Sequence, residues 1–235
     1  MTDYLFAPAP APVRSLKVLG QSAEYPVNRI FCVGRNYEAH AIEMGGTVDR
    51  EAPWYFTKTP AGAFCASGAT VPYPPGTANF HHEMELVVAI GADVFKGDLA
   101  AGQAAIFGYG CGLDMTRRDR QQDGKDNRRP WDLGKDVEQS AVLTALTPVA
   151  DIPALAGRRI HLEVNGQVRQ DATLDELVWS PAEVISHLSH FYHLAPGDLI
   201  MTGTPAGVGA VVAGDVITGG IDGLPPISLT LGPAE

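Results

Sequence analysis

The sequence contains only three cysteines, Cys32, Cys65 and Cys111, and they lie far apart along the chain. An odd number of separated cysteines without a C-x-x-C pair argues against a disulfide framework and against a cysteine zinc site. Cys32 and Cys111 lie in apolar runs that resemble strands. We therefore expect all three to be small buried residues and not nucleophiles.

Long apolar runs are missing too, and positive charge is scarce. No segment approaches the roughly 18 apolar residues that cross a bilayer, and MTDYLFAPAPAP lacks the basic and apolar regions of a secretion signal. The 17 Lys and Arg residues against 27 Asp and Glu residues give a formal net charge of −10. The negative charge of the protein would therefore repel duplex nucleic acid, which is a polyanion. We expect a cytoplasmic globular protein whose partners include neither a membrane nor a nucleic acid.

Glycine and proline are plentiful, with 26 and 18 residues, and most are spread along the chain in the manner of turns between short strands. The exception is residues 7–12 (APAPAP), which we expect to form an extended lead-in. The strands outnumber the helices and do not alternate with them, which favours a β-rich α+β roll over a doubly wound or barrel fold. Runs of β-branched and aromatic residues predict strands at 29–33, 54–57, 83–90, 105–113, 160–164, 199–202, 215–218 and 227–231.

Two segments predict helices. Residues 36–44 (NYEAHAIEM) can form about two turns, and the two glycines that follow would stop them. The second helix begins with Ser180 as N-cap, Pro181 at the first helical position and Glu183 three residues after the cap, which is a capping box. Ile185, Leu188 and Phe191 follow at helical spacing, and we expect Pro196 and Gly197 to end the element.

Glu83 and Glu85 lie two residues apart on a predicted strand, so both carboxylates point to the same face. The apolar run after them places this face near the core, where unpaired carboxylates repel each other and resist the loss of water. A bound cation removes that conflict, and Asp114, at the end of GYGCGLD, could supply a third ligand. Carboxylates suit Mg²⁺, Mn²⁺ or Ca²⁺ better than zinc. A solvated strand face, with Asp114 as a helix N-cap, fits the same pattern.

His40 and Glu43 are three residues apart in the first predicted helix, so they share a face and could pair. A carboxylate beside a neutral imidazole fixes its tautomer and raises its basicity, which makes a general base for water. The glycines on both sides of the segment would let it move as a lid. An ordinary contact on a surface helix is the alternative.

Four more polar residues could take part in a site. Arg118 and Gln121 lie one turn apart just after Asp114, where the forked guanidinium could hold the carboxylate of an anionic substrate. Lys58 and Lys135 each follow an apolar run. Either lysine could stabilise an enolate or a carboxylate, or pair with an acid.

Two other patterns predict solvent-exposed segments. Residues 117–129 (RRDRQQDGKDNRR) mix both signs of charge, which predicts a polar loop and not a nucleic-acid surface. His187, His190 and His193 follow each other at three-residue steps, so on a helix they drift around the axis and need not converge on a metal.

Five segments, GRNYEAHAIEM, HHEMELVVAIG, GYGCGLDMTRRDRQ, VNGQVRQ and PGDLIMTGTPAGVG, occur in this order over about residues 28–231. Together they resemble the fumarylacetoacetate hydrolase family. The resemblance implies a mixed β-roll with few helices, a catalytic domain over residues 28–235 after an N-terminal extension over 1–27, and a homodimer.

The same resemblance implies the residues of a site. One Mg²⁺ or Mn²⁺ per subunit would bind Glu83, Glu85 and Asp114. His40 and Glu43 would activate water on a mobile lid, and Lys135 would hold the developing oxyanion. The residues expected to bind substrate are Arg118, Gln121, Lys58 and Thr204.

The reaction that the resemblance implies is hydrolysis of the carbon–carbon bond of an acylpyruvate, a small anionic 2,4-dioxo acid. The segments DYLFAP, RIFCVGRNY, LDMTRRD and GDVITGGIDGL favour fumarylpyruvate, a compound of gentisate breakdown, with fumarate and pyruvate as products. Water would attack the ketone distal to the pyruvoyl unit, and a divalent cation can stabilise the departing enolate as a Lewis acid. Oxaloacetate decarboxylation, hydroxymuconate isomerisation and metal or organic-acid binding without catalysis are the alternatives.

Overall fold

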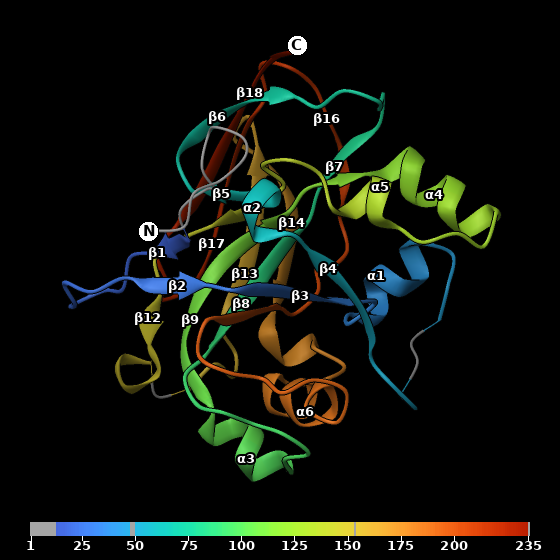
Figure 1. Cartoon of the computed structure of the whole chain (residues 1–235). Coiled ribbons are helices and arrows are strands. Elements are labelled where there is room, and N and C mark those ends of the chain that lie inside the picture. Colours follow the sequence, from blue (N-terminus) through green and yellow to red (C-terminus); the bar gives the residue numbers. More distant parts are fainter. Residues whose placement is uncertain (1–12, 48–49, 153, 235) are drawn as a thin grey trace, which may run out of the picture.

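The computed structural model describes residues 13–47, 50–152 and 154–234 (Figure 1). Strands dominate these ranges, and short helices lie around them. The segment 7–12, expected to be an extended lead-in, lies outside the described residues.

The central element is an eight-stranded mixed sheet. Its strand order is β4 (Trp54–Lys58), β3 (Arg29–Gly34), β15 (Asp198–Met201), β8 (Met84–Ile90), β9 (Ile106–Asp114), β11 (Ala141–Leu143) and β5 (Phe64–Ala66), and β12 (Thr147–Pro148) pairs with β9 beside this path. β3 and β15 run parallel, as do β11 and β5, while β8 is antiparallel to both β15 and β9.

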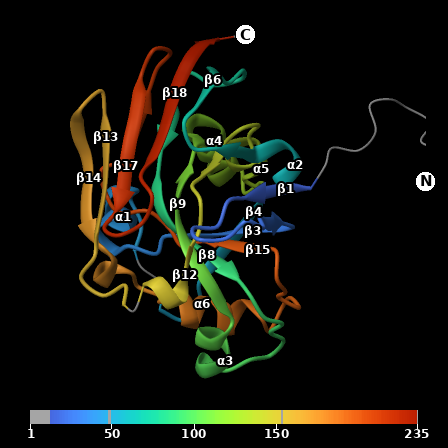
Figure 2. The same cartoon turned by 90° about the vertical axis from the view of Figure 1, so that its left-hand side faces the viewer.

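A five-stranded sheet stands beside the central one, and Figure 2 shows most of its strands side by side. Its order is β14 (Gln167–Thr173), β13 (Arg159–Val164), β17 (Val216–Ile221), β18 (Ile227–Ala234) and β6 (Ala69–Tyr73). Two small sheets complete the described strands: β10 (Thr116–Arg117), β7 (Phe80–His82) and β16 (Gly209–Val211) form one, and β1 (Arg14–Leu16) with β2 (Tyr25–Val27) forms the other.

Both faces of the central sheet are covered, because every residue of β8 is buried. On one face Leu86 and Val88 belong to the larger apolar cluster, which includes residues of the five-stranded sheet. On the other face Val87 belongs to a second cluster, which Leu16 and Tyr25 join from the first two strands. Burial on both faces explains why this strand is continuously apolar instead of alternating.

The helices lie at the edges of the sheets. α1 (Glu38–Glu43), α4 (Arg118–Asp126) and α5 (Asp132–Lys135) lie on the right of Figure 1, and α3 (Leu99–Ala104) and α6 (Pro181–Leu188) lie at its bottom. α2 is Pro60–Ala63, and two short 3₁₀ helices are Val149–Asp151 and Leu174–Glu176. Within the described residues, no helix is long and apolar enough to cross a membrane.

The predicted elements are present, with ends that differ by a few residues. All eight predicted strands and both predicted helices form. The capping box is confirmed, since the Glu183 carboxylate accepts the backbone N–H of Ser180 at 2.7 Å. The three cysteines are free and buried, as expected.

Two details of the helix predictions are wrong. α6 ends at Leu188, because the backbone N–H groups of His190 and Phe191 bond three residues back and close the last turn, which leaves Phe191 exposed. Residues 118–126 form a helix and not a loop. The buried face of this helix carries Arg118, Gln121 and Gly124, so apolar periodicity could not reveal it.

Candidate active site

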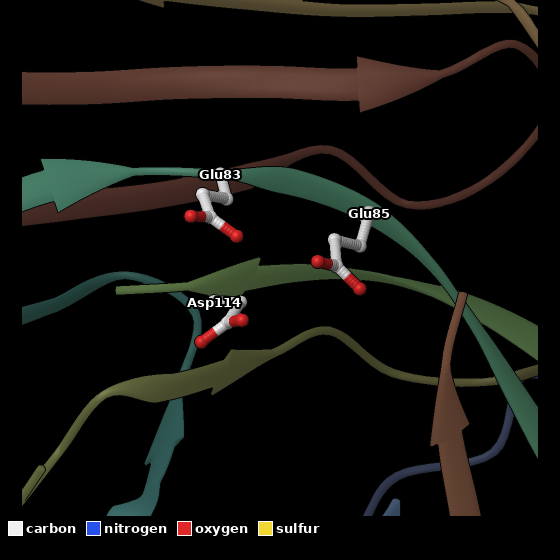
Figure 3. Close-up of side chains that lie close together, drawn as sticks. All are labelled: Glu83, Glu85 and Asp114. Atoms are coloured by element: carbon white, nitrogen blue, oxygen red, sulfur yellow. The ribbon is translucent and has the colours of Figure 1, made fainter. Parts of the chain in front are cut away.

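Three carboxylates converge where β8 begins and β9 ends (Figure 3). Glu83 immediately precedes β8, Glu85 is its second residue, and Asp114 is the last residue of β9. The backbone N–H of Asp114 donates to the carbonyl of Glu83 at 2.9 Å, which aligns the two strands at this point. One oxygen of each acid lies within 4.8 Å of the others, and all three side chains are buried. Antiparallel pairing thus brings acids from distant parts of the chain to one point.

Three cations contact two of these acids. Lys135, from α5, donates to Glu83 Oε2 at 2.8 Å and to Asp114 Oδ2 at 2.6 Å. Lys58, from β4, pairs with Asp114 Oδ1 at 2.8 Å, and Arg118 pairs with the other oxygen of Glu83. Burial alone would lower the pKa of Lys135, but Asp114 and Glu83 raise it above its ordinary value. The lysine therefore stays charged inside the site.

Glu83 and Glu85 differ in their electrostatic surroundings. Burial would raise the pKa of Glu83, but Lys135 and Arg118 hold it well below its ordinary value. The pKa of Glu85 is raised well above its ordinary value by burial, then by Asp114 and Glu83. Among the described residues no lysine or arginine forms an ion pair with Glu85, which accepts a backbone N–H from Gly203 at 2.8 Å.

The acids fit a divalent metal ion. Glu85 is buried beside two other carboxylates, which disfavours its charged form, and a metal ion at this point would stabilise that form. The ligand atoms are all carboxylate oxygens, which hard cations such as Mg²⁺ and Mn²⁺ prefer. Glu83, Glu85 and Asp114 are thus arranged as a buried acidic metal site.

The helix α1 brings a histidine and a glutamate to the same place. His40 Nδ1 lies 3.1 Å from Glu43 Oε2, and the Glu43 carboxylate also accepts the backbone N–H of Gly207 at 3.0 Å. Burial lowers the pKa of His40, while Glu83 and Glu43 act against that shift. The imidazole is therefore neutral at neutral pH, with one nitrogen directed to Glu43 and the other available for a proton.

Gly207 is fixed by its surroundings. Its φ is +97°, and a Cβ at this position would lie 1.9 Å from the carbonyl oxygen of Arg169. No other residue fits there without moving the backbone. The glycine therefore directs its N–H toward Glu43, a role that no pattern in the sequence indicated.

A small pocket, with a cavity volume of about 30 Å³, connects these groups. Of the residues predicted for the site, it is lined by His40, Glu83, Glu85, Arg118, Gln121, Lys135 and Thr204. Glu43, Lys58 and Asp114 are not among the lining residues. The wholly buried ammonium of Lys58 forms an ion pair with Asp114 and donates hydrogen bonds to Ser140 Oγ at 2.7 Å and to backbone carbonyls.

The family model for the fumarylacetoacetate hydrolase C-terminal region matches residues 29–231. The chain belongs to the fumarylacetoacetate hydrolase family. Membership confirms the predicted family and the β-rich α+β fold.

Individual members of this family are similar over most of the chain. A fumarylpyruvate hydrolase of a Ralstonia species is 52% identical over 82% of this chain and 100% of the relative. A crystal structure of fumarylpyruvate hydrolase from Pseudomonas aeruginosa, in complex with Mn²⁺ and pyruvate, is 44% identical with a TM-score of 0.91, over 98% of this chain and 100% of that one. A mitochondrial oxaloacetate tautomerase of Rattus norvegicus is 41% identical over 89% of this chain and 94% of the relative.

The pocket of this family member also has lining residues that sequence reasoning missed. They are Val33, Gly34, Arg35, Met44, Phe56, Lys125 and Trp131. Arg35 lies inside the recognised segment GRNYEAHAIEM, but nothing in its spacing gave it a chemical role. Lys125 lies in the segment expected to be a loop, and its position became visible only with α4.

Proposed function

We propose that this chain is a fumarylpyruvate hydrolase, which cleaves fumarylpyruvate with water into fumarate and pyruvate. One observation carries the proposal: Glu83 and Glu85, two of the three clustered carboxylates, line a single pocket together with His40, which pairs with Glu43. The relative from Ralstonia and the Pseudomonas aeruginosa structure bear the name of this activity at 52% and 44% identity. The matching enzyme class is that of hydrolases acting on carbon–carbon bonds in ketonic substances, EC 3.7.1.20.

The metal in this proposal is one Mg²⁺ or Mn²⁺ per subunit, held by Glu83, Glu85 and Asp114. When bound, such an ion supplies Lewis-acid stabilisation to the negative charge that develops on the pyruvoyl oxygens. Lys58 Nζ lies 2.8 Å from Asp114 Oδ1 and so fixes the orientation of this carboxylate in the metal site. Lys58 therefore acts on a ligand and not on the substrate.

Proton transfer is assigned to α1. The neutral His40 imidazole takes a proton from water as the water attacks the ketone distal to the pyruvoyl unit. Glu43 fixes the tautomer through its contact with Nδ1 and stabilises the imidazolium that forms. Gly207 holds Glu43 in this orientation through its backbone N–H.

The remaining side chains of the pocket bind and orient the substrate. The ammonium of Lys135 is charged and faces the pocket, where it can stabilise the oxyanion of the attacked ketone. Arg118 Nη1 donates to Gln121 Oε1 at 2.6 Å, so the Gln121 amide N–H groups are turned to donate elsewhere, and we assign them to the substrate. Thr204 is fixed by Gln170, which donates to its hydroxyl oxygen at 2.8 Å.

A second candidate function is oxaloacetate tautomerisation. The relative from Rattus norvegicus bears that name at 41% identity over 89% of this chain. The reaction moves a proton on a metal-held 2-oxo acid, so the same acids and the same histidine could serve it. It needs no attacking water, and it leaves every carbon–carbon bond intact.

The wider organisation is also proposed. Residues 28–235 form the catalytic domain and residues 1–27 an extension, of which Leu16, Val18, Tyr25 and Val27 contribute to the second apolar cluster. The enzyme is proposed to be a homodimer, which the resemblance to the family implies, and to work in the cytoplasm.

Product analysis tests the function. Enzyme supplied with Mg²⁺ is incubated with fumarylpyruvate and, separately, with oxaloacetate, and the products are followed by proton NMR. Equimolar fumarate and pyruvate from the first substrate support hydrolysis. Intact fumarylpyruvate together with accelerated keto–enol exchange of oxaloacetate would move the function to tautomerisation, and pyruvate from oxaloacetate would move it to decarboxylation.

A further inference from the structure

Two cations and two tryptophans form a cluster at one side of the pocket. The guanidinium of Arg35 lies 5.6 Å from the centre of the Trp54 ring, and Lys125 Nζ lies 5.5 Å from the centre of the Trp131 ring. The two indoles stack on each other, with centroids 6.1 Å apart and planes 19° apart. Each cation is thus held against one ring of a stacked pair, and Arg35, Lys125 and Trp131 line the pocket.

The backbone fixes this cluster. Arg35 has a φ of 57°, a left-handed conformation that non-glycine residues seldom adopt. A Cβ on Gly124 would lie 3.2 Å from Trp131 Cδ1 and 3.1 Å from the carbonyl of Pro130, so α4 approaches the tryptophan closely because this residue is glycine. The backbone therefore fixes the positions of both cations. A flexible side chain on the surface would need neither the left-handed backbone of Arg35 nor the close approach of Gly124 to Trp131.

The charges of these two residues are not neutralised by the metal-binding acids. Glu83 and Asp114 form their ion pairs with Arg118, Lys135 and Lys58. Among the described residues no carboxylate forms an ion pair with Arg35 or Lys125. The pKa of Lys125 is lowered by burial and then by Arg118, Arg35 and Lys135, so these four cations act on one another across the pocket. Such a group of like charges accommodates an anion.

We propose that Arg35 and Lys125 bind the carboxylate at the fumaryl end of the substrate, the end far from the pyruvoyl unit. This inference rests on the proposed function, because fumarylpyruvate carries one carboxylate at each end. The pyruvoyl end belongs to the metal site that Glu83, Glu85 and Asp114 form. The distal carboxylate meets the two unmatched cations, and the rings of Trp131 and Phe56, both in the pocket wall, face the planar double bond between the two ends.

The subsite makes a specific prediction about selectivity. An acylpyruvate without a distal carboxylate, such as acetylpyruvate, makes no contact with Arg35 or Lys125. Arg35→Gln and Lys125→Met should each lower kcat/KM for fumarylpyruvate by about 10- to 100-fold, mainly through KM. The same variants should change kcat/KM for acetylpyruvate less than about twofold. They remove only the binding of the distal carboxylate, which acetylpyruvate does not have.

Two further variants separate charge from packing. Lys125→Arg keeps a cation against Trp131 and should restore most of the activity toward fumarylpyruvate. Lys96→Met makes the same side-chain change as Lys125→Met at an exposed lysine that lies over the ring of Phe95. It should leave both substrates unaffected. Equal losses on both substrates in Arg35→Gln and Lys125→Met, with the function intact, would overturn the subsite.

A binding measurement keeps the subsite testable if hydrolysis itself fails. Quenching of tryptophan fluorescence in the Mg²⁺-loaded enzyme is titrated with fumarate and with crotonate, which has the same carbon chain but only one carboxylate. The wild type should bind fumarate at least about tenfold more tightly than crotonate. The variant with both substitutions should lose that preference. A preference that survives in the double variant, or none in the wild type, contradicts the proposal whatever the enzyme's reaction is.

Discussion

His40 Nδ1 lies 3.1 Å from Glu43 Oε2 on the short helix α1, and His40 lines the same pocket as Glu83 and Glu85, two of the three clustered carboxylates. The pair and the acids thus come from separate elements, so their functions can be removed separately by mutation.

Replacing the proposed base should abolish turnover and leave the metal site intact. His40→Ala should lower kcat for fumarylpyruvate by about 10²- to 10⁴-fold, the typical contribution of a general base. Binding of Mn²⁺, followed by electron paramagnetic resonance, should be unchanged, since none of the three acids forms a hydrogen bond with His40. Turnover at the wild-type rate would show that another group activates water.

The pH dependence should report the same histidine. The imidazole must be neutral to accept a proton, and its pKa is lowered from 6.5 mainly by burial. Activity should therefore be constant at neutral pH and fall only as the pH drops through the lowered pKa. Glu43 raises the pKa of His40, so Glu43→Gln should move this acid limb of kcat/KM to still lower pH. A limb that moves to higher pH would contradict the pairing.

Removing the charge of Glu85 should separate metal binding from stability. Glu85→Gln keeps an acceptor for the Gly203 N–H but removes a buried carboxylate that repels two others. The metal-free variant should be at least as stable as the metal-free wild type. Saturating Mn²⁺ should raise the Tm of the wild type by roughly 5–10 °C and that of the variant much less. An equal rise in both proteins would remove Glu85 from the metal site.

Lys58 should be essential for stability. Lys58→Met leaves Asp114 with one fewer buried cation, and losing one partner of a buried pair costs about 3–5 kcal/mol. The Tm should fall by on the order of 10 °C. The matched control is Lys17→Met, which breaks an ion pair with Glu24 at a lysine that is 79% exposed and should leave the Tm nearly unchanged. A Lys58→Met variant as stable as the wild type would refute this role.

The sequence predicted the features that depend on local pattern. Alternation places Glu83 and Glu85 on one face without knowledge of the rest of the fold, and Ser180 with Glu183 defines a helix start through neighbouring atoms. The regular strands were found for the same reason, since their β-branched runs are local. The resemblance to a family then ordered these pieces into one site.

Features that depend on tertiary contacts were out of reach. The helix α4 has polar residues on its buried face because that face forms the pocket, which inverts the usual pattern. Lys58 could equally have faced a substrate, and only the fold places it behind Asp114. The contact of Arg35 with Trp54 joins the residue after β3 to the first residue of β4, and these two strands pair through an antiparallel register that no sequence spacing encodes.

The most direct test of metal-dependent hydrolysis is the rate at which fumarylpyruvate loses its absorbance with metal-free enzyme, before and after Mn²⁺ or Mg²⁺ is added. We predict negligible turnover in EDTA, rapid loss of absorbance once either cation is restored, and no restoration in Glu83→Ala. Equal rates with and without a divalent cation, or a fully active Glu83→Ala enzyme, would contradict the account of the site.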